Sequence, residues 1–243
     1  ISAMGPPLQY PLNERRDHTF YQETQQKHRI ATPMGVRQQS MNAGLKQYLD
    51  RALLCIDGVP EERKRILEEV AESISAKRRS GETAELTFIC THNSRRSQMG
   101  QLWAAAAAAH FGIDGIHTYS GGTEATVFNP RAVTAMEKAG FTIEKPGGEN
   151  PRYLVSFDER GPAMECFSKT YDDPVNPNEG FVAIMTCADA DEACPVVSGA
   201  ALRAPIRYDD PKVADGTPQE AAVYEERCLQ IATEMLYLFS RVA

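Results

Sequence analysis

Beyond about residue 83, short apolar runs alternate with longer stretches of helical spacing. Four runs rich in apolar and β-branched residues predict buried strands: residues 86–90, 117–120, 181–186 and 204–208. Three amphipathic or alanine-rich stretches predict helices: residues 98–111, 129–139 and 218–239. Because strand and helix alternate, we predict an α/β fold with a small, doubly wound parallel four-stranded sheet, covered by helices on both faces.

Two parts of the chain lie outside this alternation. Residues 43–82 have two helical patterns separated by Asp57-Gly58-Val59-Pro60, and we expect an N-terminal helical hairpin that packs on the following domain or on a second subunit. Residues 151–180 predict an inserted β-hairpin, with strands at 153–157 and 165–168 around a Gly161-Pro162 turn. The catalytic domain is expected at 83–243, with this insertion inside it.

Residues 1–42 are polar, rich in Gln and Arg, and interrupted by prolines. Such a segment predicts a flexible arm, or alternatively a clasp that holds a homodimer together through the N-terminal region.

Composition narrows the classes of partner. The net charge of −7 argues against nucleic acid as the main partner, although local donors can still attract an anion into a cleft. No apolar run approaches the ~20 residues of a membrane span, so we expect no membrane association. Six cysteines without a short disulfide framework or zinc-ligand spacing suggest a reducing, cytoplasmic location and no metal site.

Polar residues follow the first strand in an order that predicts an anion site. Cys90 closes the strand, and Arg96 and Ser97 lie in the first turn of the next helix. A turn of this length can direct backbone N–H groups around a tetrahedral anion, with the positive end of the helix behind it. That field favours the Cys90 thiolate, Ser97 can donate to the sulfur, and Arg96 can hold two anion oxygens.

Cys90, Arg96 and Ser97 are therefore candidate catalytic residues. The candidate substrate-binding residues are Thr91, His92, Asn93, Ser94, Arg95 and Arg96. The alternative is a buried structural cysteine beside a surface arginine pair, but an apolar cysteine is not normally followed by five polar residues. Because ligands of parallel sheets bind beyond the carboxyl ends of the strands, Cys187 and Asp210 should gather near Cys90.

Residues 90–99 resemble the signature loop of the low-molecular-weight protein tyrosine phosphatase family, particularly its thioredoxin-coupled arsenate reductase branch. Asp210, followed by Pro211, matches the general acid of that family, although a second Asp-Asp-Pro occurs at 172–174. Residues 187–194 begin with Cys187 and end with Cys194, and they are similar to the redox segment of the reductase branch. The resemblance implies the family's four-stranded sheet with a flavodoxin-like strand order.

The resemblance also implies a mechanism. Cys90 would attack arsenate, Cys187 would release arsenite, and Cys194 would regenerate Cys90 and leave a disulfide for thioredoxin. No tightly bound cofactor is expected. Alternatively, the enzyme hydrolyses a phosphomonoester such as phosphotyrosine through a phosphocysteine, or the protein only binds an oxyanion. Cys187 and Cys194 can also be read as two core cysteines.

The spacing of that cysteine pair constrains the relay. Seven helical steps would separate Cys187 and Cys194 by about 10 Å along a helix axis. A disulfide requires Cα atoms within about 7 Å. We therefore expect residues 188–193 to be mobile or irregular.

Overall fold

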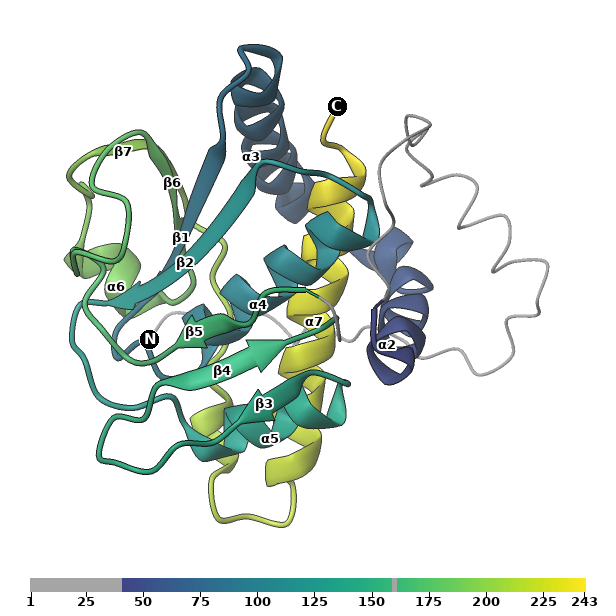
Figure 1. Ribbon diagram of the computed structural model, residues 1–243, viewed down its shortest axis with the longest axis vertical. Coiled ribbons are helices and arrows are strands. Elements are labelled where there is room, and N and C mark those ends of the chain that lie inside the picture. Colours follow the sequence, from purple (N-terminus) through teal and green to yellow (C-terminus); the bar gives the residue numbers. More distant parts are fainter. Residues whose placement is uncertain (1–40, 159–160) are drawn as a thin grey trace.

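The central sheet has the predicted parallel arrangement. The computed structural model describes residues 41–158 and 161–243, so the predicted arm falls almost entirely outside the described residues. The four strands lie in the order β2-β1-β6-β7, which is the flavodoxin-like order (Figure 1). They are β1 (Ala84–Cys90), β2 (Ile116–Gly122), β6 (Phe181–Met185) and β7 (Ala200–Ala204). All three neighbouring pairs are parallel, which confirms the predicted fold class.

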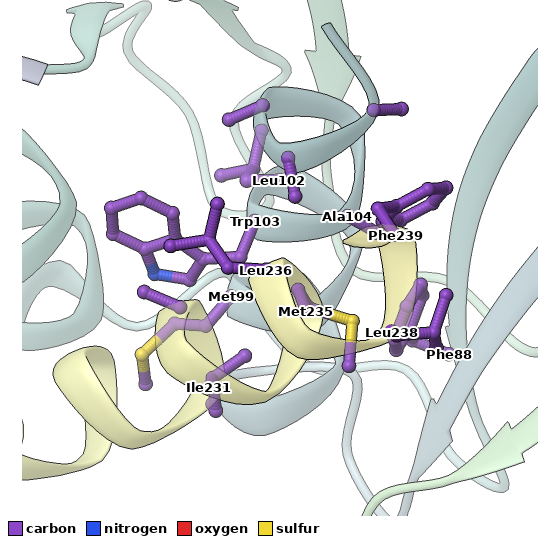
Figure 2. Close-up of a cluster of buried hydrophobic side chains, with 14 of the residues drawn as sticks. Phe88, Met99, Leu102, Trp103, Ala104, Ile231, Met235, Leu236, Leu238 and Phe239 are labelled. Atoms are coloured by element: carbon purple, nitrogen blue, oxygen red, sulfur yellow. The ribbon is translucent and has the colours of Figure 1, made fainter. Parts of the chain in front are cut away.

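One face of the sheet is covered by two long helices, α4 (Arg96–His110) and α7 (Glu220–Ser240). Figure 2 shows side chains of both helices interleaved with Phe88 of β1. Trp103 is fully buried here and stacks on Tyr48, with 5.1 Å between the ring centroids. Alternate residues of β1 serve this face, as expected for a strand buried on both sides.

The layer that packs on the opposite face of the sheet is smaller. Ile89 of β1 and Met185 of β6 pack there with Cys187 and Ala190, and the short helix α6 (Ala188–Ala193) closes the layer. Cys90 belongs to the same cluster. The two candidate cysteines at the carboxyl ends of β1 and β6 therefore share one small hydrophobic core.

The N-terminal helices are joined to the main core. Helices α2 (Ala43–Leu53) and α3 (Glu61–Arg79), linked through the 3₁₀ turn η1 (Ile56–Gly58), pack against α7 (Figure 1). Their buried residues, such as Leu49 and Ile74, belong to the same hydrophobic cluster as Phe88. The hairpin was expected to pack either on the following domain or on a second subunit, and in the structure it packs on the following domain.

The insertion has its two predicted strands, and a third strand from before the insertion joins them. Strands β4 (Tyr153–Ser156) and β5 (Met164–Cys166) form the expected antiparallel hairpin, and β3 (Thr142–Glu144) adds to its edge after α5 (Pro130–Lys138). β3 is only three residues long and mostly exposed, so its apolar pattern is too short to identify in the sequence.

The fourth main strand lies earlier than predicted. The sequence pattern indicated residues 204–208, but β7 spans Ala200–Ala204. Pro205 has no N–H to donate, which ends the ladder. Residues 205–210 continue without helix or strand to the 3₁₀ turn η2 (Pro211–Ala214). No helix within the described residues is long and apolar enough to cross a membrane.

Candidate active site

The loop between β1 and α4 folds around the sulfur of Cys90. Cys90 is the last residue of β1, and its Sγ lies 3.1 Å from the Ser97 Oγ in the first turn of α4. Asn93 Nδ2 donates to the same hydroxyl oxygen at 2.9 Å. The Ser97 hydroxyl can therefore accept from Asn93 and donate to a thiolate at Cys90.

Asn93 carries the sharpest bend of this loop. Its φ of 45° is the only positive φ of a non-glycine residue in the described part of the chain. Asparagine tolerates this left-handed conformation better than most residues. Its Oδ1 accepts from the Lys169 backbone N–H at 2.9 Å and from Gln98 Nε2 at 3.1 Å. The fully buried amide thus ties the loop both to α4 and to the segment that follows β5.

Arg96 links the loop to the segment that contains Asp210. Its Nη1 donates to the Tyr208 carbonyl at 3.0 Å, and its Nη2 donates to Asp210 Oδ2 at 2.7 Å. The other Asp210 oxygen accepts from the Lys212 N–H at 3.0 Å. The Arg96 Nε is buried and has no hydrogen-bond partner in the part of the chain that the structure describes. An orphaned cationic donor is costly, and an oxyanion at the loop could accept from it.

Two glycines at the end of β2 permit the close packing of this loop. A Cβ on Gly122 would lie 2.4 Å from the Glu124 oxygen and 2.6 Å from the Thr91 oxygen. A Cβ on Gly121 would lie 2.3 Å from the Tyr171 Cα. All three neighbours are backbone atoms, so only glycine fits at either position.

The other predicted binding residues take different directions. The His92 side chain is 45% exposed at the rim, with its Nε2 3.8 Å from Glu124. The Ser94 hydroxyl donates to the Val127 carbonyl at 2.7 Å. Thr91 Oγ1 lies 3.5 Å from the Cys187 Sγ. The structure thus directs the Thr91 side chain toward the second candidate cysteine, and the Ser94 side chain toward neighbouring backbone.

Arg95 points away from the loop. Its Nε donates to the Tyr224 hydroxyl at 2.9 Å, and its Nη2 lies 3.4 Å from Asp215 Oδ2. Tyr224 donates to the other Asp215 oxygen at 2.8 Å. Burial, opposed by the hydrogen bond from Arg95, raises the pKa of Tyr224 to about 12, so the phenol keeps its proton. Arg95 therefore anchors the start of α4 to the region around α7.

Cys187 and Cys194 lie at opposite ends of α6. Cys187 is fully buried, and its Sγ accepts from the Ala190 N–H at 3.4 Å. Cys194 follows the helix, is partly exposed, and is not disulfide-bonded. The interval that we expected to be mobile is thus helical, and its opening stays a prediction.

Helix α6 is fixed by ion pairs to β7 and to the stretch that follows β7. Asp191 is buried and pairs with both Arg203 and Arg207. Arg203 Nε also donates to the Cys194 carbonyl at 3.0 Å. The sequence pattern did not predict this cluster.

The two Asp-Asp-Pro sequences have different surroundings in the structure. Asp210 contacts Arg96, whereas Asp173 takes part in a local turn in which its Oδ1 accepts from the Val175 N–H at 3.1 Å. Sequence reasoning missed the Tyr208 carbonyl and the Lys169 N–H because both act through the backbone, and side-chain chemistry gives no signal for such contacts. No group of three or more His, Cys, Asp or Glu side chains within residues 41–158 and 161–243 is arranged to hold a metal ion.

The chain is similar to low molecular weight phosphotyrosine phosphatases and to arsenate reductases. A family model described as low molecular weight phosphotyrosine protein phosphatase matches residues 85–157. The chain is 34% identical over 140 residues to an arsenate reductase of Bacillus licheniformis, which covers 58% of this chain and 83% of that protein. It is 31% identical to an arsenate reductase of Bacillus subtilis with the same coverage. A low molecular weight phosphotyrosine phosphatase from Vibrio cholerae superposes with a TM-score of 0.43 at 14% identity, covering 64% of this chain and 94% of that one.

Proposed function

Because the chain belongs to the low-molecular-weight protein tyrosine phosphatase superfamily, with arsenate reductases among its relatives, we propose that it reduces arsenate to arsenite. It is an enzyme of the arsenate reductase or low-molecular-weight phosphatase kind. The observation that carries the proposal is the position of a second cysteine beside the anion loop. The Cys187 sulfur lies 3.5 Å from Thr91 Oγ1, and it shares a hydrophobic cluster with Cys90.

The first step is attack by the Cys90 thiolate on arsenic(V). The loop N–H groups and the guanidinium of Arg96 stabilise the charge on the arsenate oxygens. Asp210, 2.7 Å from Arg96, gives its proton to the departing oxygen, which leaves as water. Ser97 stabilises the sulfur from 3.1 Å. The product is a Cys90–arsenate thioester-like adduct.

The second step is the reduction. The Cys187 thiolate attacks the Cys90 sulfur, the S–As bond breaks, and its electron pair stays on arsenic, which leaves as arsenite. A Cys90–Cys187 disulfide forms. Cys194 then attacks the Cys187 sulfur, which releases the Cys90 thiolate and leaves a Cys187–Cys194 disulfide. A dithiol protein of the thioredoxin type is the reductant that we propose for this disulfide.

Helix α6 must open for the last exchange. It holds Cys187 and Cys194 at its two ends, about 10 Å apart along a helix axis, which exceeds the reach of a disulfide. The ion pairs of Asp191 with Arg203 and Arg207 hold this helix closed. Cys194 is partly exposed, so the resulting disulfide would face solvent and be accessible to a protein reductant.

Hydrolysis of a phosphomonoester is the second candidate. The matched residues 85–157 contain the anion loop with Cys90 and Arg96, but neither Cys187 nor Cys194. With Asp210 as acid and then base, this loop forms a complete set for a phosphocysteine intermediate.

Two assays on the purified chain distinguish these functions. The first is arsenite formation from arsenate with thioredoxin, thioredoxin reductase and NADPH, and the second is release of phenol from an aryl phosphate. We expect Cys187→Ser to abolish the first and to spare any activity in the second. Cys55→Ser, in the core near η1, is the matched control and should change neither. Arsenate reduction that survives in Cys187→Ser contradicts the proposal.

A further inference from the structure

The N-terminal helix α3 reaches the segment that carries the proposed acid. Arg63, in the first turns of α3, donates from its Nη2 to the carbonyl of Arg207. Its guanidinium also lies over the ring of Tyr208, 5.1 Å from the centroid. One side chain therefore contacts two consecutive residues of the stretch between β7 and η2.

Arg63 is itself held by a buried carboxylate. Glu234 of α7 is fully buried, and its Oε2 lies 3.1 Å from the Arg63 Nε. Gln230 Nε2 donates to Glu234 at 3.2 Å. A buried carboxylate is stable only when it is paired, so Glu234 fixes the orientation of the guanidinium above Tyr208.

The contacted stretch has little regular structure of its own. Residues 205–210 belong to no helix or strand, and Pro205 has no N–H. Two main-chain hydrogen bonds of this stretch run from the Ile206 N–H to the Ala204 carbonyl of β7 at 3.1 Å and from the Tyr208 N–H to the Thr186 carbonyl after β6 at 3.0 Å. This stretch nevertheless carries the Tyr208 carbonyl that holds Arg96, and Asp210 lies only two residues further on.

We propose that Arg63 is a positioning residue for the oxyanion site, so that α3 helps to set the geometry of the active site. By fixing the Arg207 carbonyl and the Tyr208 ring, Arg63 sets where the Tyr208 carbonyl and Asp210 meet Arg96. The inference rests on the proposed function only in that Asp210 protonates the leaving group.

The proposal predicts a loss of activity that is larger for esters with a poor leaving group. In Arg63→Lys the charge opposite Glu234 remains, but an ammonium has no planar fork to bind the Arg207 carbonyl while covering the Tyr208 ring. If Asp210 is misplaced, an ester with a poor leaving group suffers most, because it depends most on protonation. We expect kcat/KM for phenyl phosphate to fall at least about threefold further than kcat/KM for p-nitrophenyl phosphate, which loses only the shared contribution of anion binding.

The control is Arg78→Lys, because Arg78 lies at the other end of the same helix and also donates to a backbone carbonyl, that of Ala243 at 3.1 Å. Arg78→Lys should leave kcat/KM for both esters unchanged. If Arg63→Lys folds poorly, the double variant Arg63→Met with Glu234→Gln removes the charge pair together and should show the same selective loss. Equal losses on both esters, or no loss, overturn the inference.

A measurement of phosphate binding separates this inference from the proposed function. If wild type turns over neither arsenate nor either ester, the proposed function fails. Isothermal titration of the full chain with inorganic phosphate then tests Arg63 directly, since Arg96 is held through Tyr208. Several-fold weaker binding by Arg63→Lys than by Arg78→Lys supports the inference, and equal binding overturns it.

Discussion

Replacing Asn93 with alanine should destabilise the protein more than any other single change in the loop. The Asn93 side chain makes hydrogen bonds with the Ser97 hydroxyl, the Lys169 N–H and the Gln98 amide. At about 1 kcal/mol each, their loss costs about 3 kcal/mol. Alanine at a φ of 45° adds about 1 kcal/mol, for about 4 kcal/mol in total.

Asn93→Gly separates the two contributions. Glycine adopts this φ without strain but loses the same hydrogen bonds, so we expect a cost of about 3 kcal/mol. Asn129→Ala is the control, because Asn129 caps α5 with a single bond from the Arg131 N–H at 2.9 Å. The loss of one N-cap should cost about 1 kcal/mol.

Urea unfolding followed by tryptophan fluorescence measures these differences. The chain has one tryptophan, Trp103, which is fully buried and reports on the main core. With a slope of about 2 kcal/mol per molar urea, Asn93→Ala should lower the midpoint by about 2 M. A loss no greater than that of Asn129→Ala would refute the view that Asn93 holds the loop together.

Two further substitutions, an alkylation experiment and a pH dependence test other features. Gly122→Ala places a Cβ within 2.6 Å of loop backbone and should abolish phosphate binding measured by titration, whereas Gly58→Ala, with no atom within 4 Å, should not affect it. Asp191→Asn weakens the ion pairs that hold α6, so the Cys187–Cys194 disulfide should form about tenfold faster under diamide, as measured by mass spectrometry. An unchanged rate would contradict the view that these ion pairs hold α6 closed. Burial raises the pKa of Cys166 and of Cys228 to about 12, so iodoacetamide at about pH 8 should leave both unmodified. Because the unfolded thiols ionise near pH 9 and the folded ones do not, these two groups should also lower stability as pH rises above that value.

The local parts of the site could be predicted from the sequence. Cys90, the polar turn and Arg96 are consecutive, so the strand, the loop and the start of α4 follow from patterns within a few residues. Asp210 was expected near Cys90 because ligands of parallel sheets bind beyond the carboxyl ends of the strands, and the structure places its carboxylate 2.7 Å from Arg96 of the loop.

Contacts between distant segments could not be predicted in this way. The sequence predicted that Arg95 binds the anion. In the structure its side chain instead contacts Tyr224 and Asp215, which lie much later in the chain. Likewise, Arg63 meets the Arg207 carbonyl across 144 residues, and one partner is a backbone atom that carries no sequence signal. Such contacts depend on tertiary packing, which residue type and spacing do not encode locally.

The central claim is that the two electrons for arsenate reduction reach arsenic through Cys90 and are supplied by the cysteine pair at α6, which ends oxidised. Disulfide mapping by mass spectrometry after one turnover of arsenate, without added reductant, tests it directly. Wild type should yield one arsenite and a Cys187–Cys194 disulfide, and Cys194→Ser should yield one arsenite and a Cys90–Cys187 disulfide. Arsenite released with all three thiols still reduced, or a disulfide that omits Cys187, would contradict the account.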